Sequence, residues 1–136
     1  AKFNPRANSA PQTYAIGIKE LWEIDPERHE KGLVWHTFGW PMDSSTYGGG
    51  FLYHFGDNLV SIGLVVGLGY QNPYLSPFEE MQRLKTHPQV APLFKGGKRL
   101  AYGARAIAAG GDGSSVAVAA TGPVPVVSRA PRAAGV

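Results

Sequence analysis

Apolar residues in the first part of the chain recur at every second position, which is the period of a strand with one buried face. Residues 13–24 and 32–42 both show this alternation, and Pro41 is expected to end the second run or leave it at a sheet edge. We therefore expect two strands here. The side chains that define their faces are Tyr14, Ile16 and Ile18 in the first run, and Val34, His36 and Phe38, opposite Trp35 and Thr37, in the second.

Residues 50–68 predict a β-hairpin. Two apolar runs flank Gly56, Asp57 and Asn58, which tolerate the positive φ angles of a tight turn. A further short strand is predicted over residues 98–106.

One helix is predicted between this hairpin and the last strand. Ser76 is a suitable N-cap, Pro77 suits the first helical position, and Glu79 places an acid close to the N-terminus. The helix is expected to run to about His87, because Pro88 cannot continue it. The apolar face of this helix would consist of Phe78, Met81 and Leu84, with the stem of Lys85.

The element order β-β-β-β-α-β predicts an α+β fold, a mostly antiparallel sheet with one packed helix. Residues 1–12 contain two prolines and are interpreted as a linker, and residues 13–106 as the domain. Residues 107–136 hold no aromatic side chain, no Leu and no Lys. Such a segment buries little surface, so we expect a disordered C-terminal tail.

The amino-acid composition excludes several kinds of site and partner. The chain of 136 residues contains no cysteine, which excludes a disulfide framework, a zinc finger and an iron–sulfur cluster held by its own thiolates. Its 13 basic and 10 acidic residues are mixed along the chain, so nucleic acid is not an expected partner. No apolar stretch approaches the roughly 18 to 20 residues that span a bilayer.

The four histidines, His29, His36, His54 and His87, do not have the spacing of zinc motifs. His36 and His54 are candidates to face each other across neighbouring strands. Without cysteines or a carboxylate cluster we expect no metal, and interpret the histidines as partly buried or rim residues.

A run of three glycines, Gly48 to Gly50, stands between Tyr47 and an aromatic strand. Glycines at the start of a strand leave the main chain bare, so a flat ligand can approach it closely. An apolar slot with one or two donors would suit a quinone. A glycine bulge that only shapes the hairpin explains the same run, and spacing alone favours that explanation. The surrounding aromatic residues are Trp35, Phe38, Trp40, Tyr47, Phe51 and Tyr53.

Longer stretches of sequence decide between these alternatives. PQTYAIGIKELWEI, GLVWHTFGWPMDSSTYGGGFLYH, VVGLGYQNPYLSPFEEMQRLKTHP and GGKRLAYGARA resemble, in order and spacing, the central part of the electron transfer flavoprotein–ubiquinone oxidoreductases. The resemblance covers residues 2 to 106. It implies that this chain is a fragment that supplies most of a ubiquinone-binding domain.

The resemblance also implies a membrane-associated oxidoreductase that takes electrons from reduced electron transfer flavoprotein and passes them to ubiquinone. Such enzymes hold FAD and a 4Fe-4S cluster, and they lie at the mitochondrial inner membrane on the matrix side or at the bacterial inner membrane on the cytoplasmic side. The FAD fingerprint, the cluster cysteines and the membrane-dipping segments of the family are missing from this chain. We therefore expect it to bind neither cofactor and to be inactive alone.

Gly48 and Gly49 fall on the family motif whose main chain contacts the quinone oxygens. Quinone reduction also needs protons, for which Tyr47, His36 and His54 are candidate donors. The alternative function is a stand-alone module that binds an apolar aromatic ligand or a partner protein without catalysis.

Overall fold

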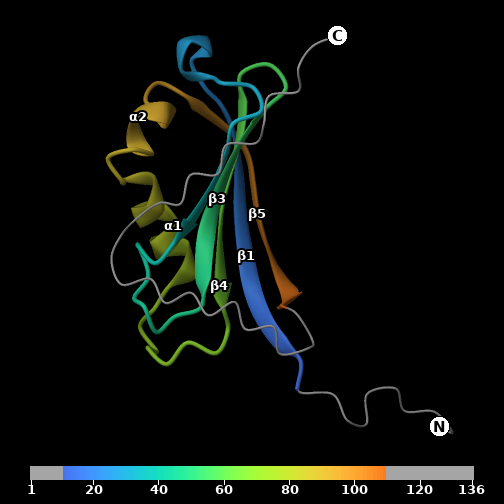
Figure 1. The fold of residues 1–136 in the computed structure, drawn as a ribbon, viewed down its shortest axis with the longest axis vertical. Coiled ribbons are helices and arrows are strands. Elements are labelled where there is room, and N and C mark those ends of the chain that lie inside the picture. Colours follow the sequence, from blue (N-terminus) through green and yellow to red (C-terminus); the bar gives the residue numbers. More distant parts are fainter. Residues whose placement is uncertain (1–10, 110–136) are drawn as a thin grey trace, which may run out of the picture.

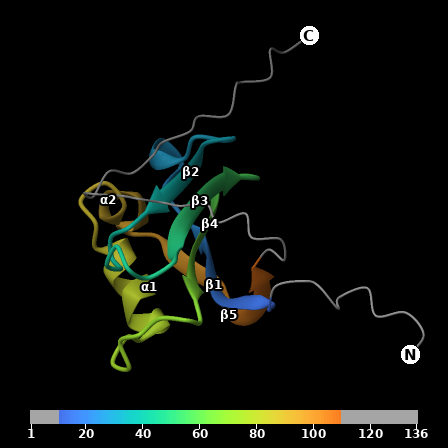
Figure 2. The ribbon, with the colours of Figure 1, turned by 60° about the horizontal axis from the view of Figure 1, so that its bottom comes forward.

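The computed structural model describes residues 11–109, which form one antiparallel sheet with two helices against a single face (Figures 1 and 2). The strand order across the sheet is β2-β3-β4-β1-β5, so β2 and β5 are the edges. The elements are β1 (Thr13–Glu23), the 3-10 turn η1 (Pro26–Arg28), β2 (Val34–Phe38), β3 (Gly48–Phe55), β4 (Leu59–Gly67), α1 (Pro77–Lys85), α2 (Ala91–Phe94) and β5 (Lys98–Ala109).

The predicted fold class is confirmed, since the molecule is a small α+β domain with a mostly antiparallel sheet and one main helix. The predicted hairpin is also present as β3 and β4. Gly56 and Asn58 in its turn have φ angles of 55° and 60°, which is the left-handed conformation that these residue types tolerate. The structure adds the four-residue helix α2, which the sequence pattern did not predict.

The last strand is longer than predicted. β5 continues past residue 106 through Ala109, where Ala109 pairs with Thr13 and Ile107 with Ala15. The first residues of β1 offer this partner, so the ladder holds the main chain at the end of β5. Residues 1–10 and 110–136, which hold most of the expected linker and tail, lie outside the described residues.

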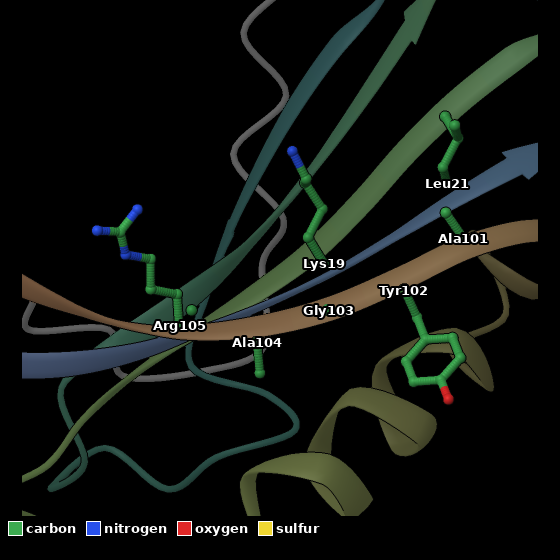
Figure 3. Close-up of a pocket in the computed structure, with 8 residues that line it drawn as sticks. Lys19, Leu21, Ala101, Tyr102, Gly103, Ala104 and Arg105 are labelled. Carbon is green, nitrogen blue, oxygen red and sulfur yellow. The ribbon is translucent and has the colours of Figure 1, made fainter.

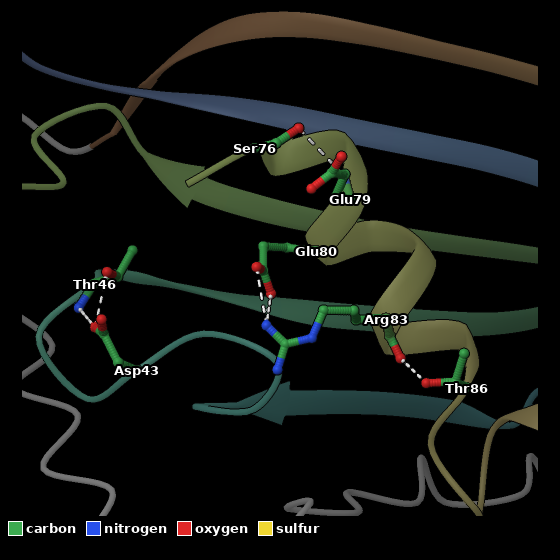
Figure 4. Close-up of polar contacts among 7 residues, drawn as sticks. All are labelled: Asp43, Thr46, Ser76, Glu79, Glu80, Arg83 and Thr86. Carbon is green, nitrogen blue, oxygen red and sulfur yellow. Dashed lines mark hydrogen bonds and ion pairs between the residues drawn. The ribbon is translucent and has the colours of Figure 1, made fainter. Parts of the chain in front are cut away.

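Helix α1 begins as predicted, with the side chain of Ser76 accepting a hydrogen bond from the backbone N–H of Glu79 (Figure 4). It ends at Lys85, two residues before His87. Met81 and Leu84 are buried, but Phe78 is 52% exposed, so its assignment to the apolar face was wrong. The buried part of the helix begins at Met81, one turn after Phe78. No helix among residues 11–109 is long and apolar enough to cross a bilayer.

The core lies between the sheet and α1. Residues of β4 and β3 supply its centre, and Trp22, Trp35 and Phe94 pack around it. The buried apolar side chains that form this cluster are Ile18, Ile24, Met42, Leu52, Val60, Ile62, Leu64, Val66, Met81, Leu84 and Val90.

A carboxylate, Glu20, is buried at the edge of this core and is 3% exposed. Lys85 of α1 donates to both of its oxygens at 2.8 and 3.1 Å, and Arg99 of β5 lies 3.3 Å from Oε1. The indole N–H of Trp22 donates to Oε2 at 2.7 Å. Burial alone would raise the pKa of Glu20, but these hydrogen bonds and charges together hold the pKa below its ordinary value. The charged carboxylate thus links β1, α1 and β5.

We expect Glu20→Gln to lower the free energy of unfolding by about 1–3 kcal/mol, because the amide leaves Lys85 partly buried without its counter-charge. Urea unfolding at pH 7 measures this loss. Glu23→Gln, which removes an exposed glutamate of the same strand, is the matched control and should change stability by less than about 0.5 kcal/mol. Equal effects of the two substitutions would contradict the role given to Glu20.

Candidate functional site

The two faces of β3 have different surroundings. Gly50, Leu52 and His54 are buried and point toward α1, as shown by a Cβ built on Gly50, which would lie 2.9 Å from Cδ2 of Leu84. Alternate residues of the strand, Gly49 and those two and four positions later, therefore belong to the face that the helices leave open.

A groove of about 430 Å³ lies on this open face, over the ends of β2, β3 and β4. Its size falls within the range of small-molecule sites, and apolar and aromatic side chains line most of it. The lining residues are His36, Thr37, Phe38, Tyr47, Gly48, Gly49, Gly50, Phe51, Tyr53 and Val65.

The main chain of Gly48 faces the end of the groove. The backbone N–H of Gly67 donates to the carbonyl oxygen of Tyr47, and the backbone N–H of His54 donates to Leu33 on the β2 side. Because N–H and C=O directions alternate along an antiparallel strand, those of Gly48 point toward β2. The last β2 residue in the ladder is Phe38, opposite Gly49, so β2 provides no ladder partner at Gly48.

The glycines are also required by the sheet itself. A Cβ at Gly49 would lie 2.3 Å from the carbonyl oxygen of Thr37, and a Cβ at Gly48 would lie 2.1 Å from that of Val65. The backbone N–H of Gly50 donates to Oγ1 of Thr37 at 3.0 Å, so this donor is already engaged. Close strand packing and a bare groove surface therefore come from the same residues.

An aromatic row forms the side of the groove. Phe51 lies over Gly63 of β4, where a Cβ would be 2.2 Å from the ring atom Cζ. The rings of Phe51 and Tyr53 are stacked with centroids 4.9 Å apart, and the Tyr53 ring lies 5.6 Å from that of His36. The hydroxyl of Tyr53 is 3.4 Å from Nε2 of His36. The row thus ends in two polar groups.

A tight turn positions Tyr47 and the glycine run. Oδ1 of Asp43 accepts hydrogen bonds from the backbone N–H and the hydroxyl of both Ser45 and Thr46, at 2.7 to 3.0 Å (Figure 4 shows the contact with Thr46). These bonds, with that from the Ser45 hydroxyl the strongest, hold the pKa of Asp43 below its ordinary value. The turn leads directly into β3 at Gly48.

Two of the three predicted proton donors, His36 and Tyr47, line the groove with Gly48 and Gly49. His54 does not, and the expectation that it could face His36 was wrong. Within the sheet His36 is paired with Phe51, while His54 points to the helix side. The sequence analysis did not identify Tyr53 as a polar group of the site. Tyr53 follows Phe51 by two residues and Gly49 by four, so the period of a strand already placed it on the same face as both.

His54 occupies a buried pocket of its own and is 2% exposed. Its Nδ1 accepts the backbone N–H of Glu30 at 3.1 Å, and its ring centroid is 5.2 Å from that of His29. Burial, with a smaller contribution from His29, lowers the pKa of His54 to about 4. The imidazole is therefore neutral at pH 7. Nowhere between residues 11 and 109 do three or more His, Asp or Glu side chains gather as a metal site.

A second hollow of about 410 Å³ lies over β1 and β5. Lys19, Leu21 and Arg105 project from one face of this strand pair, and Tyr102 from the other (Figure 3). Gly17 is opposite Val65 in the ladder, so this hollow and the groove share the open face of the sheet.

We expect Gly49→Ala to destabilise the domain by about 2 kcal/mol or more, because the added Cβ meets the main chain of Thr37. Gly103→Ala is the control, since a Cβ there has no neighbour within 4 Å, and it should be neutral or stabilising by a few tenths of a kcal/mol. Thermal and urea unfolding of both variants would test this. Equal tolerance of alanine at both positions would mean that β2 and β3 do not approach so closely.

Acid should destabilise the native state through His54. The unfolded imidazole binds a proton near pH 6.5, whereas the native one does so only near 4. This contribution is complete above pH 6.5 and is lost as the pH falls toward 4, by up to about 3 kcal/mol. Unfolding free energies measured from pH 7.5 to 4 should fall less steeply for His54→Gln than for the unmodified chain. A slope unaffected by His54→Gln would refute the assignment.

The comparisons with known proteins agree with one another. A family model described as "ETF-QO, ubiquinone-binding" matches residues 14–107. The chain is 62% identical over 112 residues to the mitochondrial electron transfer flavoprotein-ubiquinone oxidoreductase of Homo sapiens, covering 81% of this chain and 18% of the relative. It is 53% identical over 111 residues to a probable mitochondrial enzyme of the same name from Saccharomyces cerevisiae, covering 82% and 18%. The chain thus spans less than a fifth of the length of these curated relatives. It belongs to the family of electron transfer flavoprotein–ubiquinone oxidoreductases.

Proposed function

We propose that the groove on the open face binds the headgroup of ubiquinone, with the main chain of Gly48 and the bare surface of Gly49 against the ring. The observation that carries this proposal is the position of Gly48, which lines an apolar groove just beyond the last residue pair of the β2–β3 ladder. The family model supports it, because its description names ubiquinone binding.

The two glycines have different parts in this proposal. Gly48 offers a backbone donor to one quinone oxygen, and that donor stabilises the negative charge that develops on reduction. Gly49 pairs with Phe38 and Val65 and so contributes an empty surface above the strand rather than a free donor. Phe38 and Phe51 form apolar walls for the ring.

At the level of the full-length protein, the proposed activity is reduction of ubiquinone with electrons from electron transfer flavoprotein, and the names of the relatives, which contain both molecules, support it. We propose a mitochondrial or bacterial inner membrane location, with the membrane surface as the source of the quinone. FAD and a 4Fe-4S cluster do not fit the residues of this chain. It has no cysteine, and Gly67–Leu68–Gly69 leads from β4 into a turn and not into a helix. Both groups are assigned to other parts of the full-length enzymes.

Titration of the 136-residue chain with a short-tailed, water-soluble ubiquinone analogue tests the binding site. We expect NMR shifts of the Gly48 and Gly49 amides and of the Phe51 ring, with little change at the β1 and β5 hollow. Val65→Phe places a larger side chain in the groove from β4, opposite Gly49, and should weaken binding at least about tenfold through loss of space for the ring.

Leu100→Phe is the matched control, since it enlarges a 45% exposed side chain of β5 outside the groove. It should bind the analogue as the unmodified chain does. Shifts confined to other surfaces, or equal binding by Val65→Phe, would contradict the proposed site. Equally tight binding of a similar aromatic without quinone oxygens would favour the simple apolar-ligand module instead.

A further inference from the structure

We propose that Tyr53 and His36 act together to deliver a proton to the quinone held in the groove. This inference rests on the proposed function and extends it, because it assigns a catalytic residue and a residue that positions and recharges it. Neither side chain is needed for the contacts with Gly48 and Gly49.

The geometry selects this pair. Tyr53 and His36 lie on adjacent strands, β3 and β2, and both line the groove. The Tyr53 hydroxyl and Nε2 of His36 are 3.4 Å apart, a long hydrogen bond of the kind that catalytic groups often form before substrate binds. Stacking on Phe51, with centroids 4.9 Å apart, fixes the plane of the Tyr53 ring. The pair therefore forms a polar end to an otherwise aromatic row.

The other protic groups nearby are less suited. The hydroxyl of Thr37 lies on the helix side of the sheet, because a Cβ at Gly50 would meet both Oγ1 of Thr37 and Cδ2 of Leu84. The side chain of Tyr47 lies at the glycine end of the groove and is 55% exposed. His54 is buried on the helix side of the sheet. Tyr53 is the lining hydroxyl that has an imidazole as its hydrogen-bond partner.

Ubiquinone gains two electrons, which reduced electron transfer flavoprotein supplies to the full-length enzyme, and two protons, so that both C=O groups become C–OH. The Tyr53 hydroxyl gives its proton to the quinone oxygen at its end of the groove, and the imidazolium form of His36 replaces that proton from Nε2–H, which leaves a neutral imidazole. His36 is exposed and regains a proton from water. The oxygen at the glycine end takes the second proton from water beside the exposed Tyr47.

The experiment uses a full-length oxidoreductase of the family that carries this segment, assayed with reduced electron transfer flavoprotein and a short-tailed ubiquinone analogue. Tyr53→Phe keeps the stacked ring and removes the proton. We expect kcat for quinone reduction to fall about 100-fold, with KM changed less than about threefold. Reduction of ferricyanide, which takes up no proton, should be unchanged.

His36→Gln provides a second, independent variant at an exposed position. It should lower kcat about 10-fold or more and remove a limb of the pH profile of kcat that the unmodified enzyme shows. A merely structural role for His36 would leave the shape of that profile unchanged. Tyr74→Phe, at a 91% exposed tyrosine outside the groove, is the control and should behave as the unmodified enzyme.

Unchanged quinone reduction by both Tyr53→Phe and His36→Gln would overturn this inference. Val65→Phe in the same enzyme separates that result from failure of the proposed function. If Val65→Phe abolishes quinone reduction while the two polar variants remain active, the binding site stands and the proton pair is wrong. If Val65→Phe is also fully active, the quinone does not occupy this groove and both proposals fall.

Discussion

The close approach of β2, β3 and β4 at the glycine run is the contact on which the site depends. Side chains at Gly48 and Gly49 would meet the carbonyl oxygens of Val65 and Thr37 at 2.1 and 2.3 Å. These neighbours are main-chain atoms and cannot rotate away, so the three strands can come this close only beside glycine. The same lack of side chains leaves space on the open face between Phe38 and Phe51. A structural glycine run and the proposed binding surface are therefore one feature and not competing explanations.

The buried polar groups of the helix side make that side sensitive to acid. Glu20 has a lowered pKa, so its contribution to stability is present above the ordinary carboxyl pKa and is lost as the pH falls below it. As the pH falls, the contribution of His54 to stability is lost before that of Glu20, because the imidazole of the unfolded chain takes up its proton at a higher pH. On the open face, by contrast, His36 is exposed and can gain a proton without placing a charge in the core. The proposed proton transfer and the stability of the core thus depend on opposite faces of the sheet.

Short-range signals in the sequence predicted short-range structure well. The turn at Gly56 to Asn58 and the Ser76 cap depend on residues within a few positions of each other, and both are confirmed. Pairing between strands that are distant in the sequence was harder to predict. Composition gave no sign that β5 would continue to Ala109, since its partner is the start of β1, about ninety residues earlier. The two-residue period of the strand does place His54 on the same face as Leu52. Applying this period to the whole strand would have put His54 and His36 on opposite faces of the sheet.

The open face contributes little to the core, and this determines how the domain can support a site. Glycines at positions 17, 49, 63 and 103 lie in cross-strand rows with Val65, Phe51 and Lys19, so much of that face has no side chain to bury. Stability must come from the opposite face, where α1 covers Leu64 and Val66 and Lys85 reaches Glu20. Side chains around the groove are consequently free to serve a ligand, provided that the main chain of the glycine run is left undisturbed.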